Sequence, residues 1–194
     1  MSKDVYLLLK IYIELAILVC LITIPIATII IVYRGKVKKR NGLHYNYLVE
    51  SIFALLIIYF LVLIALTLTP MPITNNGQIK INLIPFLNII EIFNEKVINP
   101  NYSILLIILN ILLFIPLGSL FTLFLNLKRK YVFIRVFLIG FFVSFFIEFF
   151  QLVFITGRTT DIDDIINNVI GTLLGCIIMK LGIYFFQIKC KNIE

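Results

Sequence analysis

Residues 132–156 read VFIRVFLIGFFVSFFIEFFQLVFIT, an almost entirely apolar run. It exceeds the roughly 20 mostly apolar residues that a helix needs to cross the hydrocarbon core of a bilayer. Backbone N–H and C=O groups must be hydrogen-bonded within the segment when lipid surrounds it, so the stretch is expected to be helical. The sequence therefore predicts a membrane-spanning helix that carries the carboxylate of Glu148 inside the membrane.

Four further apolar stretches lie near residues 15–33, 51–69, 103–127 and 162–188, and each is long enough to span a bilayer. The whole chain is 61% hydrophobic and 14% charged, which leaves too little polar surface to cover a soluble globule of this size. The predicted fold class is all-α, a polytopic membrane helix bundle of about five transmembrane helices.

Three parts are expected along the chain. Residues 1–50 hold an N-terminal transmembrane helix and a basic cytoplasmic loop, residues 51–188 form the main membrane domain, and residues 189–194 form a short cytoplasmic tail. No separate soluble domain and no internal repeat are visible, and the missing repeat argues against a transporter.

The long connection between the second and third spans contains a distinct apolar segment from Asn82 to Lys96. Asn88, Glu91 and Glu95 follow one another at intervals of three and four, which predicts an amphipathic helix with one narrow polar stripe. We expect this segment to be interfacial or re-entrant, on the outer membrane face. It would cover the bundle as a lid or grip a lipid-like ligand, and both roles stay open.

The distribution of Lys and Arg predicts the orientation of the chain. Twelve of the 17 basic residues fall in residues 34–50, in residues 128–135 and near the C-terminus. Cytoplasmic loops are enriched in Lys and Arg, so a bacterial cell membrane would hold the N-terminus outside and the C-terminus in the cytoplasm. Because the basic residues cluster beside apolar stretches, the net charge of +7 does not indicate nucleic-acid binding.

Glu148 is the most informative residue, because a carboxylate within hydrocarbon costs about 2.5 kcal/mol or more unless it pairs, protonates or meets water. Gln151 follows it by three residues and shares its helix face. Asn110 in the third span is expected at nearly the same depth, so these polar groups can meet.

A second polar stripe opens the fifth span. Asp161, Asp164, Asn168, Gly171 and Gly175 recur at intervals of three and four. The two glycines form a GxxxG pattern that allows another helix to pack closely, while the residues before them present carboxylates and an amide. Together with the polar groups of the third and fourth spans, they predict one pocket whose candidate ligand-binding residues are Asn110, Glu148, Gln151, Arg158, Asp161, Asp164 and Asn168.

Three readings of this pocket remain open. It is a hydrogen-bond network that fixes helix register, or a binding site in which the Arg158 guanidinium receives a phosphate or carboxylate headgroup, or a catalytic site with Glu148 as general acid or base. Asp163 has a plainer interpretation, since Thr160 three residues before it resembles a capping box. No HExxH or GxSxG motif is present, and we expect no metal and no cofactor, with one alternative left open in which several of the carboxylates hold a divalent cation.

The motifs together resemble the VanZ-like family, of the teicoplanin-resistance type. The resemblance covers roughly residues 55–180 and rests on NLIPF at 82–86, NILLFIPLG at 110–118, EFFQ at 148–151 and GRTTDIDDIINNVIGTLLG at 157–175. It implies a multi-pass bacterial membrane protein, in some members linked to reduced sensitivity to lipid-tailed glycopeptide antibiotics.

The leading hypothesis is an outer-leaflet pocket that engages an amphiphile and so modulates sensitivity to lipophilic glycopeptides. The expected partners are the lipid bilayer and either a lipid-linked cell-wall precursor or the lipoglycopeptide itself. The alternative is a membrane enzyme that modifies a lipid or cell-wall precursor with Glu148 as its acid or base. The oligomeric state is open.

Overall fold

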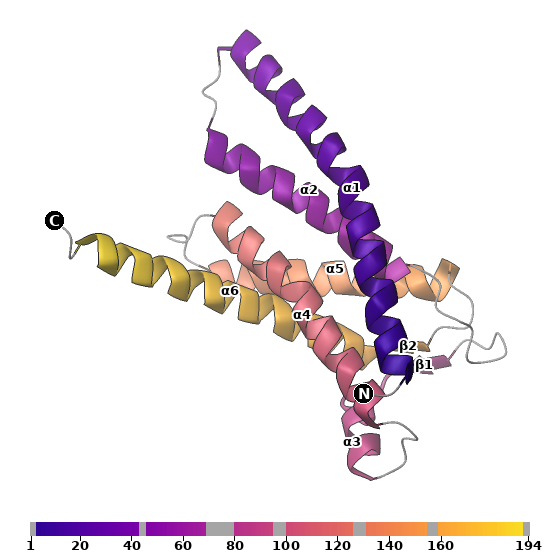
Figure 1. The fold of residues 1–194 in the computed structure, drawn as a ribbon. Coiled ribbons are helices and arrows are strands. Elements are labelled where there is room, and N and C mark those ends of the chain that lie inside the picture. The colour runs from indigo at the N-terminus through magenta and orange to yellow at the C-terminus, as the bar shows by residue number, and fades with distance from the viewer. Residues whose placement is uncertain are drawn as a thin grey trace. The chain divides into compact units, whose positions relative to one another are not determined.

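The computed structural model describes residues 3–42, 46–68, 80–94, 100–125, 131–154 and 159–191. The predicted fold class is confirmed, because the chain is an all-α helix bundle (Figure 1). It divides into two compact units, residues 1–69 and residues 70–194.

The first unit is a helical hairpin of α1 (Lys3–Arg40) and α2 (Tyr47–Leu68). Basic residues fill the last turn of α1, where the negative end of the helix dipole favours them. Asn46 caps α2, because its Oδ1 accepts hydrogen bonds from the backbone N–H groups of Leu48 and Val49 at 3.1 and 3.3 Å.

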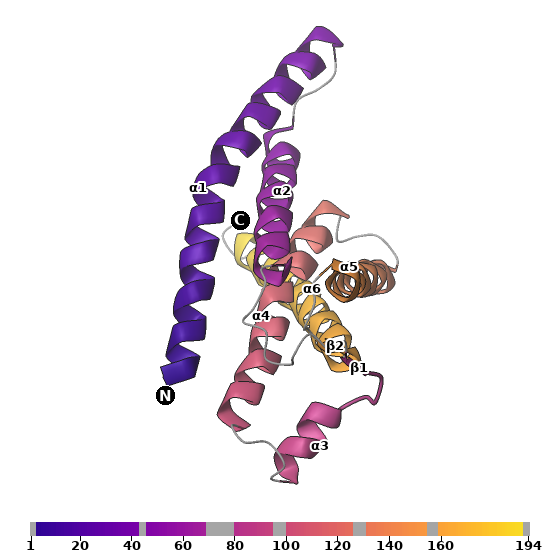
Figure 2. The same ribbon diagram turned by 90° about the vertical axis from the view of Figure 1, so that its right-hand side faces the viewer.

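The described residues of the second unit form four helices and a pair of short strands (Figure 2). In chain order they are β1 (Lys80–Asn82), α3 (Leu87–Phe93), α4 (Pro100–Phe124), α5 (Val132–Phe154), β2 (Thr159–Asp161) and α6 (Ile162–Lys191). The most extensive packing joins α4 to α6, and α5 packs on α6 as well.

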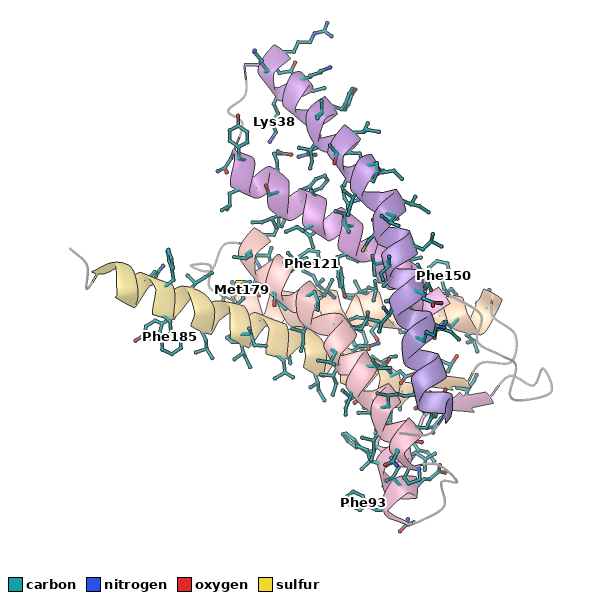
Figure 3. All side chains as sticks on the ribbon, in the orientation of Figure 1. Lys38, Phe93, Phe121, Phe150, Met179 and Phe185 are labelled. Atoms are coloured by element: carbon teal, nitrogen blue, oxygen red, sulfur yellow. The ribbon has the colours of Figure 1, made fainter. Side chains whose placement is uncertain are left out.

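Among the described residues, five helices are long and apolar enough to cross a membrane. They are α1, α2, α4, α5 and α6. Their outer faces expose large apolar side chains such as Phe146, Leu181 and Phe185, and Phe185 points away from the helices in Figure 3. Lipid is the environment that such faces require, so the chain is a multi-pass membrane protein.

One end of the second unit has an apolar core. Val132, Val136 and Cys176 are almost completely buried there, with Phe121 and Leu125 packed against them. This core joins the start of α5 to the middle of α6 and the end of α4. The polar residues of α5 and α6 therefore lie toward the other end of the unit.

The predicted helix from residue 82 is wrong in its first turn, because the helix begins only at Leu87. Asn82 belongs to β1, and its Oδ1 accepts a hydrogen bond from the backbone N–H of Ile84 at 3.0 Å. Pro85 has no N–H to donate, and Phe86 adopts a left-handed conformation with φ 62°. Of the predicted polar stripe, Glu95 and the side chain of Asn88 lie outside the described residues.

The strand pair was not predicted from the sequence. β1 and β2 are parallel, with Ile81 opposite Thr160 and Asn82 opposite Asp161. This pairing holds the segment before α3 beside the first turn of α6.

Candidate functional site

The buried face of α5 is polar. Ser144, Glu148 and Gln151 are 0, 4 and 6% exposed, and their spacing of four and three places them on one side of the helix. The opposite side carries phenylalanines that are about half exposed, Phe146 and Phe149 among them. The helix thus turns its polar side chains toward protein and its aromatic rings toward lipid.

Two contacts fix the register of α5 against α6. Nδ2 of Asn168 donates a hydrogen bond to Oγ of Ser144 at 2.8 Å. One turn along each helix, a Cβ on Gly140 would lie 2.6 Å from Oγ1 of Thr172. Residue numbers rise on α5 as they fall on α6, so the helices are antiparallel.

The same register extends toward the start of α6. One turn beyond Ser144 and Asn168, the antiparallel pairing brings Glu148 level with Asp164. Three residues further, Gln151 is level with Asp161. The candidate residues of the two helices therefore occupy matching levels along the helix pair.

The third helix of the site is α4, whose Asn110 donates from Nδ2 to Oδ1 of Asp164 at 2.5 Å. Close backbone packing makes this contact possible. A Cβ on Gly171 would lie 2.2 Å from the carbonyl oxygen of Ile111, and one on Gly175 would lie 2.0 Å from that of Ile115. α4 and α6 are thus in backbone contact just beyond the polar end.

Asp161 holds the segment before α3. Its Oδ1 accepts hydrogen bonds from Nδ2 of Asn82 and from the backbone N–H of Asp163, both at 3.0 Å. The second bond makes Asp161 the cap of α6. The predicted cap at Thr160 is wrong, because Thr160 lies in β2 and its buried Oγ1 has no hydrogen-bond partner in the described structure.

Asp163 holds the same segment at a second point. Its Oδ1 accepts a hydrogen bond from the backbone N–H of Phe86 at 2.5 Å. This bond supports the left-handed conformation of Phe86, which costs free energy for a residue other than glycine. Two carboxylates of α6 and its cap therefore fasten the NLIPF segment to the bundle.

The structure thus joins most of the predicted pocket residues into one polar cluster. We use this name for Asn110, Ser144, Glu148, Gln151, Asp161, Asp163, Asp164 and Asn168. Arg158, the predicted headgroup contact, lies outside the described residues. Sequence reasoning missed Ser144, although its spacing of four from Glu148 on the same face is a usable signal.

Asn168 is 4% exposed, and its Oδ1 has no hydrogen-bond partner among the residues that the structure describes. A buried amide oxygen in this position is an acceptor available to a donor from outside the chain, such as water or a ligand hydroxyl. Within the described ranges, no three His, Cys, Asp or Glu side chains are grouped as the ligands of a metal ion would be.

Fold and site together define a multi-pass membrane protein with a buried polar cluster between three of its helices. A family model described as VanZ/LLP1 matches residues 53–185. The chain belongs to the VanZ/LLP1 family. No curated protein and no solved structure matches the chain significantly.

The family match includes α2 from residue 53 onward and the whole of the second unit except its last residues. It leaves α1 outside. The domain limits expected at residues 50 and 188 remain predictions.

Proposed function

We propose that the chain modulates the sensitivity of a bacterial cell to lipophilic glycopeptide antibiotics of the teicoplanin type. In this proposal the polar cluster lies in the outer leaflet and engages the polar part of an amphiphile. The amphiphile is a lipid-linked cell-wall precursor or the lipoglycopeptide itself. Membership in the VanZ/LLP1 family supports this direction.

The observation that carries the proposal is the convergence of buried polar side chains from three helices. Glu148 is 4% exposed and level with Asp164, to which Asn110 donates a hydrogen bond. Ionisable residues inside membrane helices are costly and most often serve substrate or ion recognition. Apolar side chains of similar size would pack the same helices at no such cost.

The surface beside the cluster suits the apolar part of an amphiphile. Leu83, Phe86 and Phe93 are 70, 50 and 82% exposed. Leu83 and Phe86 belong to the NLIPF segment that Asp161 and Asp163 fasten to α6, and Phe93 lies in α3, which follows it. The polar cluster, which would bind the polar part of the amphiphile, is therefore directly next to an exposed apolar surface, which would bind its apolar part.

Arg158 is expected to contact an anionic headgroup, because a guanidinium offers two parallel N–H donors to a phosphate or carboxylate. Arg158→Lys keeps the charge and loses that fork. The variant is expected to protect less well than the wild type, and full protection would remove Arg158 from the proposal.

The deciding experiment measures growth inhibition by teicoplanin in sensitive Gram-positive cells that express the wild type, Glu148→Gln or Glu14→Gln at equal membrane abundance. Both variants change a glutamate to its isosteric amide. The Glu14 side chain is 65% exposed and lies in the other unit. We expect protection by the wild type and by Glu14→Gln, and its loss in Glu148→Gln.

Two results would contradict the proposal. Equal protection by all three proteins would make Glu148 a structural residue. If none of them protects, the function of this chain lies outside glycopeptide sensitivity.

A second candidate function rests on the level position of Glu148 and Asp164. Two carboxylates at the same level of a helix pair could act as proton donor and proton acceptor, which are the roles that acid–base catalysis requires. The chain would then modify a lipid or cell-wall precursor, with Glu148 as acid or base. Mass spectrometry of the envelope lipids separates the two functions, because only an enzyme creates or removes a species in a Glu148-dependent manner.

A further inference from the structure

The cytoplasm-proximal end predicted for α1 carries five basic residues, and the hairpin sorts them into two groups. Arg34 donates from Nε to Oε2 of Glu50 at 2.8 Å, and Lys38 contacts the other oxygen of the same carboxylate. The Arg34 guanidinium also lies 4.2 Å from the centre of the Phe53 ring. Figure 3 labels Lys38 on the inner side of α1.

Arg34 and Lys38 form the inner group. Their charge is neutralised in part by the carboxylate of Glu50, which is fully buried. Arg34 and Lys38 are four residues apart, so they share the face that α1 turns toward α2. Thr23 and Ala27, which are buried, lie on this same face. Glu50 therefore pairs with the two basic side chains that lie on the face turned toward α2.

The outer group lies on the opposite face. Lys36, Lys39 and Arg40 are exposed. Residues 29, 33, 36 and 40 recur at intervals of four, three and four, which places them on one stripe along the helix. At about 100° per residue, this stripe points away from the face that holds Arg34 and Lys38.

Along the helix, the exposed residues of this stripe change from apolar to aromatic to basic. A membrane changes in the same order from its hydrocarbon core to the interface and the headgroups. Ile29 and Tyr33 are 69 and 67% exposed, and Lys36 and Arg40 follow them. Apolar side chains belong in hydrocarbon, tyrosine is enriched at the interface, and basic residues belong at the headgroups. Tyr47, at the start of α2, is 79% exposed at the same end of the hairpin.

This end of the hairpin has an excess of positive charge. Five basic residues stand against one carboxylate, which gives a formal charge of +4. The nearest other acidic residue along α1 is Glu14, which pairs with Lys10 and lies roughly 30 Å from Arg34 by helix rise. Within the described part of the hairpin, the outer cations therefore face no nearby acid on their own helix.

We propose that Lys36, Lys39 and Arg40 form a binding surface for the phosphate headgroups of anionic phospholipids. Tyr33 anchors the surface at the interface, and the Glu50 contacts keep Arg34 and Lys38 out of it. The site is independent of the polar cluster and of the function proposed for that cluster. It gives α1, which lies outside the family match, a role of its own.

The test uses the full chain in phosphatidylcholine vesicles that contain traces of spin-labelled phosphatidylglycerol or spin-labelled phosphatidylcholine. Electron paramagnetic resonance measures the fraction of each labelled lipid that the protein immobilises. The wild type is expected to prefer phosphatidylglycerol. Lys36→Gln/Arg40→Gln is expected to lower this preference at least about fivefold, because cations near an anionic surface each contribute favourably.

The matched control is Lys3→Gln/Lys10→Gln, which removes the same charge from the other end of α1 and is expected to keep the wild-type preference. Lys36→Arg/Arg40→Lys keeps the charge in place and is expected to do the same. Equal loss in the two glutamine variants would mean that only total charge matters and would overturn the site. Absence of any preference in the wild type would overturn it as well.

A last arm distinguishes bilayer headgroups from free phosphate. Sodium phosphate and sodium chloride at matched ionic strength are expected to lower the preference equally, by screening. Stronger competition by phosphate would mean that the surface takes the free anion, which overturns its assignment to lipid. Lys10, Lys36 and Arg40 are exposed, so their substitutions are expected to leave the helices intact, and circular dichroism verifies equal helicity of all variants.

Discussion

Asn110 and Asp164 join α4 to α6 through a hydrogen bond of 2.5 Å between Nδ2 and Oδ1. Both residues belong to the polar cluster, and the bond links two of the three helices that form it. Removing this bond therefore tests whether the polar cluster stabilises the bundle.

Asn110→Ala removes this donor. We expect the free energy of unfolding to fall by about 1–3 kcal/mol, the usual cost of leaving a polar group inside the protein without its hydrogen-bond partner. Thermal unfolding of the detergent-purified chain measures the effect. Asn101→Ala, at an exposed position of the same helix, is the control and is expected to change little. Equal stability of the two variants would contradict a stabilising role for this bond.

Gly171→Ala is expected to force α4 and α6 apart, because its Cβ would lie 2.2 Å from the carbonyl oxygen of Ile111. The expected loss is about 1–3 kcal/mol, as for other overpacked contacts. Gly182→Ala makes the same change in the same helix, where nothing lies within 4 Å of the new Cβ. This control is expected to keep or slightly raise the Tm, and a loss in the control alone would refute the packing argument.

Asp163→Ala is expected to release the segment before α3. The backbone N–H of Phe86 loses its acceptor, so its hydrogen exchange should become faster, while amides in the middle of α4 keep their rates. Asp163→Asn retains an oxygen at the same position and should change the exchange less. Unchanged exchange at Phe86 in the alanine variant would mean that the strand pair alone holds the segment.

Glu50→Gln is expected to lower the stability of the α1–α2 hairpin by about 1–3 kcal/mol, because Arg34 and Lys38 lose their charged acceptor while remaining partly buried. Glu14→Gln is the matched control. Its carboxylate is 65% exposed and 3.8 Å from Lys10, and exposed ion pairs contribute little. The Tm values of the two variants measure the effect. Equal values would argue against a stabilising role for the contacts of Glu50 with Arg34 and Lys38.

The membrane-spanning helices could be predicted from the sequence because a span in hydrocarbon must be helical and consist mostly of apolar residues. The stretch around Glu148 shows this well. Its length predicted α5, and the cost of a carboxylate in lipid predicted burial of the side chain, which is 4% exposed. The spacing of Gln151 and Asn168 likewise predicted the faces on which they lie.

The contacts between distant segments could not be predicted in the same way. Asn82 and Asp161 are 79 residues apart, and each strand that carries them has only three residues. So short a strand has no detectable hydrophobic period. The capping residue was misplaced at Thr160 for a related reason, because Asp161 gains its role from where β2 ends.

Glu50 was overlooked although Arg34 and Lys38 have the spacing of a shared face. Their partner lies on the next helix, and the sequence does not reveal which residues of two adjacent spans are at equal depth. The predicted orientation, with the N-terminus outside and the C-terminus in the cytoplasm, remains a prediction.

The glycines between α4 and α6 limit how this protein can respond to a ligand. At Gly118, Gly171 and Gly175 the two backbones touch without an intervening layer of side chains. Because no side chains separate the two helices there, neither helix can tilt or slide against the other by rearranging side chains. Any movement that accompanies binding is therefore expected in α5 and in the NLIPF segment. These two parts contact the α4–α6 pair through side chains and a few hydrogen bonds.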